Sequence, residues 1–132
     1  MPRLSVWMLR LSLVSLLIGS GAGAMLLSGV ALKAGPPALR SGHLDLMLFG
    51  WLVQFVLGVA YWILPRDARA PDRGPVGLAW AAFWVFQAGL IAVLAGAAGV
   101  APQSATPSGR VLLTAATLLF LVLLGPRVRS SG

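Results

Sequence analysis

The residues best suited to chemistry lie together at the start of one apolar stretch, SGHLDLMLFGWLVQFVLGVAYWILPR, which covers residues 41–66. This stretch contains His43, the only histidine in the chain, and Asp45 two positions later. A neutral imidazole is the commonest metal ligand among side chains and a standard axial ligand of haem iron. The chain has no cysteine, which excludes thiolate ligands and covalent haem attachment through this chain. Metal or haem ligation by His43 is therefore the chemistry to consider.

The face of the helix that carries His43 has an unusual composition for a segment in lipid. Residues three and four apart share a helix face, and from His43 that face runs through Met47, Gly50, Gln54 and Gly58. Small residues in membrane helices usually let another helix approach closely. The alternative is a flat planar group that lies against the glycines and is tied by a metal bond to His43. Met47 lies only one turn from His43 and cannot reach the opposite side of the same ring, so packing is its favoured role.

The elements that position these residues are four apolar runs separated by Pro-rich or Gly-rich breaks. Hydrophobic residues make up 58% of the 132 residues and charged residues 10%, whereas soluble domains have about 45–50% and 25%. A membrane-spanning helix needs about 20 residues. The sequence therefore predicts an all-α membrane protein, a four-transmembrane-helix bundle that forms a single domain over residues 1–132. We expect its helices at about 6–32, 43–64, 76–100 and 111–124.

The orientation follows from the distribution of lysine and arginine. With both termini cytoplasmic, seven basic residues lie inside and three lie outside, as the positive-inside rule requires. We therefore expect a multi-pass protein of the cell inner (plasma) membrane, with His43 at the outer boundary. The net charge of +7 is carried by residues that flank the apolar runs, so lipid headgroups are the expected partner and nucleic acid is not. The inner residues are Arg3, Arg10, Arg66, Arg69, Arg73, Arg127 and Arg129, and the outer residues are Lys33, Arg40 and Arg110.

Residues 42–66, GHLDLMLFGWLVQFVLGVAYWILPR, resemble the second transmembrane helix of haem-copper oxidase subunit I and its relatives. In that family a histidine near the outer end of this helix is an axial ligand of the low-spin haem. The resemblance thus implies that His43 binds haem b. Full-length members have twelve helices and further histidines for a second haem and a copper or iron, and those residues are absent here. No complete catalytic centre exists in one chain, and copper binding is left open.

The twelve helices of the family form three groups of four, so this chain resembles one group, that is, a short four-helix relative. We expect a homo-oligomer, a trimer or a dimer, or a larger respiratory complex, in which a neighbour supplies the second axial ligand. Arg40 and Arg110, with Lys33 behind them, are the cations available to haem propionates at the outer surface. Alternatively, these residues only end helices at the headgroups. The predicted cofactor contacts are His43, Met47, Gly50, Gln54, Gly58, Arg40 and Arg110, with His43 as metal ligand.

Asp45 has a different expected role from that of His43. Residues two apart point to nearly opposite sides of a helix, so Asp45 is expected to accept a hydrogen bond from the fourth helix, with Arg110 as the donor.

The predicted function is haem b binding with a role in electron transfer or in haem or gas sensing. The alternative is a cofactor-free structural or assembly subunit of a respiratory membrane complex, packed through its glycine-rich faces. A channel or transporter ranks last, because the helix interiors contain few polar residues beyond Gln54 and Gln87. The chain has no glutamate and no mid-helix carboxylate, which argues against a proton-coupled exporter.

Overall fold

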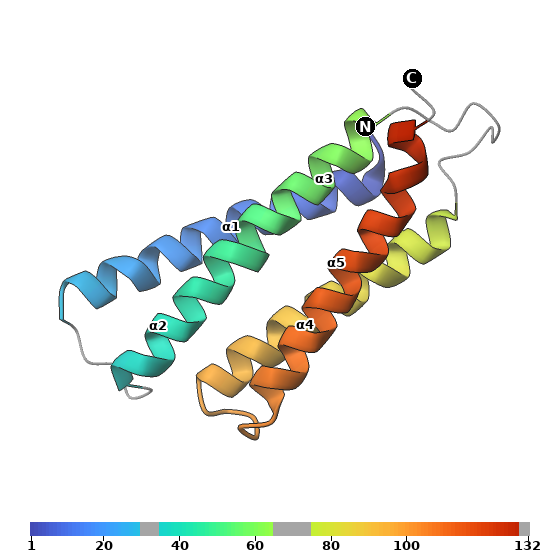
Figure 1. The fold of residues 1–132 in the computed structure, drawn as a ribbon. Coiled ribbons are helices and arrows are strands. Elements are labelled where there is room, and N and C mark those ends of the chain that lie inside the picture. Colours follow the sequence, from blue (N-terminus) through green and yellow to red (C-terminus); the bar gives the residue numbers. More distant parts are fainter. Residues whose placement is uncertain (30–34, 65–74, 130–132) are drawn as a thin grey trace.

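The computed structural model describes residues 1–29, 35–64 and 75–129, which are helical apart from short connections (Figure 1). The elements are α1 (Arg3–Leu27), α2 (Gly35–Asp45), η1 (Leu46–Val53), α3 (Gln54–Ile63), α4 (Val76–Ala97) and α5 (Ala105–Arg129). The π-helical segment η1 joins α2 directly to α3, so these three elements form one continuous rod. Four helices are long and apolar enough to cross a membrane, at Arg3–Leu27, Pro37–Ile63, Val76–Ala97 and Ala105–Val128. The predicted all-helical fold with four candidate spans is confirmed.

The helices are arranged as two hairpins that lie beside each other (Figure 1). In the first hairpin, α1 packs along α2, η1 and α3, and in the second, α4 packs along α5. Further contacts between α2 and α4 join the hairpins. The start of α1 and the end of α5 lie at the same end of the molecule (Figure 1).

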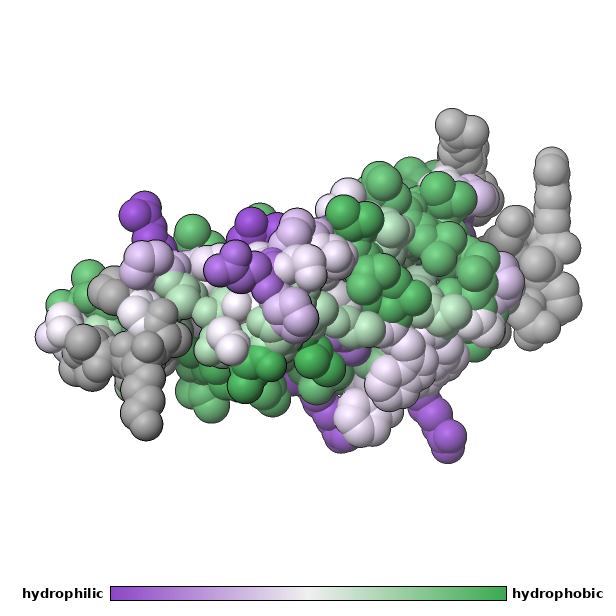
Figure 2. All heavy atoms as spheres, turned by 90° about the horizontal axis from the view of Figure 1, so that it is seen from below, coloured by the Kyte–Doolittle hydropathy of each residue, from purple (hydrophilic) through white to green (hydrophobic). Residues whose placement is uncertain are grey.

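Large apolar side chains cover most of the outer surface of the helices. Figure 2 shows hydrophobic residues over much of one face and hydrophilic residues gathered in a few separate places. Leu17, Ile91 and Val122 are each at least two-thirds exposed although they lie in the middle of their helices. Exposed apolar surface on this scale requires a nonaqueous environment, and the hydrocarbon of a bilayer provides one.

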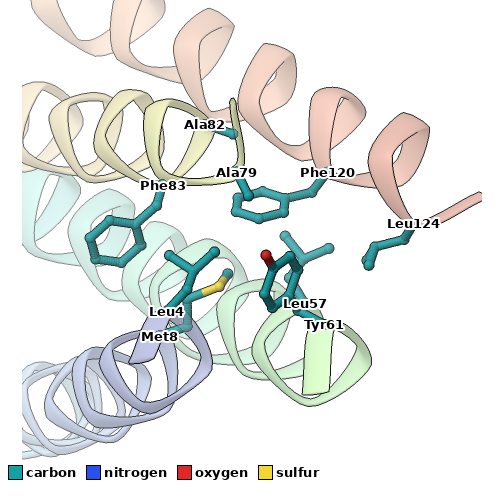
Figure 3. Close-up of a cluster of buried hydrophobic side chains, with 9 residues drawn as sticks. All are labelled: Leu4, Met8, Leu57, Tyr61, Ala79, Ala82, Phe83, Phe120 and Leu124. Atoms are coloured by element: carbon teal, nitrogen blue, oxygen red, sulfur yellow. The ribbon is translucent and has the colours of Figure 1, made fainter. Parts of the chain in front are cut away.

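A cluster of buried side chains holds all four spans together near the end that carries the termini (Figure 3). Phe83 of α4 and Phe120 of α5 are almost completely buried in it, together with Tyr61 of α3 and Met8 of α1. Arg127 near the end of α5 lies over the ring of Tyr61, with its guanidinium carbon 4.8 Å from the ring centroid. The other members of the cluster are Leu4, Leu57, Ala79, Ala82 and Leu124.

Two helices begin earlier than the apolar runs that predicted them. The second begins at Gly35 instead of about residue 43, and the fourth at Ala105 instead of about residue 111. The sequence analysis placed loops at the prolines there, because proline disrupts a helix interior. Pro37 and Pro107 lie instead in the first turns of α2 and α5, where a backbone N–H would have no intrahelical acceptor, so its absence in proline costs nothing. The first helix also ends earlier, at Leu27, and the third at Ala97.

Glycines bring α4 and α5 into direct backbone contact. A Cβ added at Gly109 would lie 2.6 Å from the carbonyl oxygen of Gly89 and 2.8 Å from the backbone nitrogen of Val93. A Cβ added at Gly89 would in turn lie 2.9 Å from the carbonyl oxygen of Gly109. Because these neighbours are backbone atoms, a side chain at either position forces the helices apart. The two glycines therefore fix the separation of the second hairpin.

We predict that Gly109→Ala destabilises the protein by about 1 to 3 kcal/mol, the usual cost of overpacking. The measurement is unfolding of the purified protein by SDS in detergent micelles. Gly125→Ala is the matched control on the same helix, since a Cβ there meets nothing within 4 Å. Equal stability of the two variants would contradict this account of the α4–α5 contact.

The predicted orientation rests on the sequence alone. Lys33, Arg66, Arg69 and Arg73 lie outside the described residues. The cytoplasmic placement of both termini therefore stays a prediction.

Candidate functional site

His43 lies in the interface between α2 and α1, about midway between buried and exposed. Its Nδ1 is 2.7 Å from the carbonyl oxygen of Gly19 on α1. The ring also lies over Gly23, where an added Cβ would be 2.9 Å from the imidazole Cε1. Gly23 therefore lets the backbone of α1 approach the ring this closely, whereas a Cβ at Gly19 would meet the side chains of Met47 and Leu46. The sequence analysis identified the histidine but not its partner on α1.

The contact with Gly19 fixes which ring nitrogen carries the proton. A carbonyl oxygen can only accept a hydrogen bond, so Nδ1 must be the donor. In the neutral imidazole the lone pair then resides on Nε2. No hydrogen bond to Nε2 is present among the described residues. A metal-ligating histidine almost always donates its second N–H to a carbonyl or a carboxylate, which orients the ring and raises its basicity. His43 therefore has the arrangement of a ligand with Nε2 available.

The predicted common face of the second span exists, and it faces α1. An added Cβ at Gly19 would lie 2.9 Å from the sulfur of Met47, which places Met47 beside His43 on this face. The Cβ of Ser15 is 2.8 Å from the position a Cβ at Gly50 would take, and the Cβ of Met8 is 3.0 Å from that at Gly58. In this structure α1 therefore fills the space beside both glycines. The packing alternative describes the arrangement seen, and cofactor contact by these residues stays a prediction.

Gln54 is the one polar member of this face whose side chain has no partner in the described structure. It is completely buried, and neither its oxygen nor its nitrogen has a hydrogen-bond partner among the described residues. A buried, unsatisfied amide is unfavourable by about 1–3 kcal/mol. Gln54 follows directly after η1, and π-helical segments occur frequently at functional sites. Nothing in the sequence analysis indicated this widened segment.

Asp45 and Arg110 form an ion pair between α2 and α5, as the sequence analysis predicted. Arg110 donates from Nη2 to Oδ2 of Asp45 at 2.9 Å and from Nε to Oδ1 at 3.3 Å. Nη2 also donates to the hydroxyl of Ser41 at 3.1 Å, and that hydroxyl lies 3.4 Å from Oδ2 of Asp45. The Asp45 side chain is 7% exposed and that of Arg110 is 49% exposed. The pair thus joins the two hairpins through a buried carboxylate and a half-exposed guanidinium.

The structure brings Arg40 and Arg110 together at one pocket of about 470 Å³. His43 is not among the described residues that line this pocket, which are Leu26, Pro37, Arg40, Ser41, Leu44 and Arg110. The two predicted propionate partners thus line one pocket, and the imidazole is not among its described lining residues. Their role toward propionates stays a prediction.

Few side chains in the described structure are placed to bind a metal ion. Among the residues that the structure describes, no three histidine, cysteine, aspartate or glutamate side chains come together. His43 fits the role of a single axial ligand, with its second nitrogen held by Gly19. The slot predicted beside Gly50 and Gly58 does not fit a porphyrin while α1 is in place.

Gly23→Ala should displace the imidazole, because its Cβ would approach Cε1 of His43 more closely than nonbonded carbon atoms tolerate. We expect a weakened hydrogen bond to Gly19 and a loss of about 1 kcal/mol in the free energy of unfolding. The loss in unfolding free energy is measured by SDS unfolding of the purified variant in detergent micelles. Gly21→Ala is the control, since a Cβ there meets nothing within 4 Å. A loss of equal size in both variants would show that the ring does not depend on Gly23.

Comparison with known proteins adds one match. Residues 3–125 match the family model described as cytochrome c and quinol oxidase polypeptide I. The match covers the first three spans and most of the fourth, whereas the resemblance seen in the sequence covered the second span. Searches among curated proteins and among solved structures find no match.

Proposed function

Because the chain belongs to the cytochrome c and quinol oxidase polypeptide I family, we propose that it binds haem b in the membrane with His43 as an axial ligand. The observation that carries the proposal is the 2.7 Å contact between Nδ1 of His43 and the carbonyl oxygen of Gly19. This hydrogen bond presents Nε2 as a lone-pair donor and holds the ring in one orientation. The proposed role is electron transfer, or haem or gas sensing. A haem supplies one-electron redox chemistry or a site for a gas molecule when bound.

The residues of this chain would hold, orient and shield the haem. His43 is the ligand, the carbonyl oxygen of Gly19 orients its ring, and Gly23 leaves the space that lets α1 lie against it. Met47, Gly50, Gln54 and Gly58 contact the porphyrin only if α1 moves away from them, since it covers this face in the structure.

A second histidine ligand cannot come from the same chain, because His43 is the only histidine. We therefore propose a homo-oligomer, a dimer or a trimer, or a larger respiratory complex in the plasma membrane. Two copies of His43 brought to one iron would complete a bis-histidine haem. The same requirement leaves one chain without a complete catalytic centre for oxygen or nitric oxide. We make no proposal for copper.

A cofactor-free structural subunit is the second candidate, and a specific observation favours it. Ser15 and Met8 of α1 occupy the space beside Gly50 and Gly58, which is what a helix-packing face requires. In that case the family resemblance reflects the shared helix arrangement and not haem binding.

The deciding experiment is an absorption spectrum of the purified full chain after expression with added haem precursor, together with the haem-to-protein ratio and the native mass. A Soret band that shifts on reduction, with one haem or less per chain in a defined oligomer, supports the proposal. Stable, folded protein without a Soret band after haem addition overturns it and leaves the structural subunit.

A further inference from the structure

The pocket beside α2 has a composition different from that of the His43 site. Pro37, Arg40, Ser41 and Leu44 contribute its α2 side, at the spacings of three, four and seven that place residues on one helix face. Leu26 near the end of α1 and Arg110 near the start of α5 are the other described residues in the lining. His43 faces α1 instead, through its contact with Gly19. His43 is therefore not among the described residues that line this pocket.

The charges around the pocket do not balance. Arg110 is paired with Asp45 through two of its nitrogens. In the part of the chain that the structure describes, no acidic side chain pairs with Arg40. Asp67 and Asp72, the other two acidic residues, lie outside the described residues. The two guanidinium groups and the single carboxylate leave one positive charge in the described pocket without a counterion. An anion is the complementary ligand.

The location of the pocket and its apolar lining indicate which class of anion it would bind. Leu26 lies next to the end of the span Arg3–Leu27, Pro37 begins the next span, and Arg110 follows the start of Ala105–Val128. These positions correspond to a membrane surface, where arginine side chains reach the headgroups. Leu26, Pro37 and Leu44 supply apolar surface next to the two cations. The ligand therefore combines an anionic head with a hydrocarbon chain.

We propose that this pocket binds one anionic phospholipid. The phosphate accepts hydrogen bonds from the guanidinium of Arg40 and from the exposed side of Arg110, and one acyl chain lies against Leu26 and Leu44. Arginine is well suited to this role because its planar guanidinium can donate two hydrogen bonds to one phosphate. Basic pockets between transmembrane helices are known to hold anionic headgroups in this manner.

The test is native mass spectrometry of the full chain, titrated with phosphatidylglycerol and separately with phosphatidylcholine. We expect a preference for phosphatidylglycerol in the wild type, and about tenfold weaker binding of that lipid in Arg40→Gln, the loss expected for one charge-assisted hydrogen bond. Arg10→Gln is the matched control, because Arg10 is an exposed arginine on α1 that does not line the pocket. Arg40 is itself exposed, so its replacement leaves the core intact.

Four outcomes would overturn the proposal. The first is equal binding of the two lipids by the wild type, and the second is an equal loss in Arg40→Gln and Arg10→Gln. The third is competition by millimolar inorganic phosphate as strong as that by the lipid, which would identify the ligand as free phosphate. His43→Ala is expected to keep the lipid preference. Its loss in that variant would assign the pocket to haem propionates and contradict a separate lipid site.

Discussion

His43→Ala is expected to lose essentially all bound haem, so that its Soret absorbance is no higher than that of protein prepared without haem. The imidazole is the only histidine ligand in the chain, and its Nδ1–H is already committed to Gly19 at 2.7 Å. Replacing the imidazole therefore removes Nε2, the proposed iron ligand, together with the hydrogen bond to Gly19 that orients the ring. The measurement is the haem-to-protein ratio of the purified variant beside that of the wild type.

A loss of haem is informative only if the variant still folds. Alanine removes one hydrogen bond, with a net value of about 0.5–1.5 kcal/mol, which the packing of four spans should tolerate. Circular dichroism and native mass must therefore match the wild type. Met47→Leu is the control, because it nearly conserves volume on the same face and removes the other possible axial donor. Loss of haem in Met47→Leu with retention in His43→Ala would reverse the assigned roles.

The sequence predicted the parts of this fold that depend on apolar length and on charge. Four candidate spans follow from runs long enough to cross a bilayer, and the structure has them. The pairing of Asp45 with Arg110 followed from helix geometry, since a carboxylate two residues from His43 had to face a different neighbour. The first inference needs only the length of an apolar helix that crosses a bilayer, and the second needs only the helix repeat and the cost of an unpaired charge in an apolar environment.

The sequence could not specify what lies against the face of His43. Glycines at positions 50 and 58 permit either a helix or a flat ring, because each only removes side-chain volume. Choosing between them requires the position of α1, which depends on contacts distant in sequence such as Ser15 with Gly50. The widened segment Leu46–Val53 has no comparable signature either. The helix starts were misplaced for a simpler reason, since a proline ends a helix interior but is tolerated in a first turn.

Arg110→Ala is expected to destabilise the protein by about 3 kcal/mol, the lower part of the range for breaking a buried ion pair. The cost arises mainly at Asp45, whose side chain is 7% exposed and would lose both hydrogen bonds from the guanidinium. Ser41, at 3.4 Å from Oδ2, would be its remaining donor. The pair also joins the two hairpins, so its loss should loosen α2 from α5.

Asp45 is buried and Arg110 is half-exposed, so replacing Arg110 should cost more stability than replacing Asp45. Asp45→Asn should cost only about 1 kcal/mol, because the half-exposed Arg110 can be solvated and the amide oxygen still accepts a hydrogen bond. The double variant Asp45→Asn with Arg110→Gln should regain most of the stability lost in Arg110→Ala, since no buried charge remains unpaired. SDS unfolding of the three variants in one detergent measures these differences. Small and equal losses in Arg110→Ala and Asp45→Asn would contradict the prediction and mean that the ion pair contributes little to holding the hairpins together.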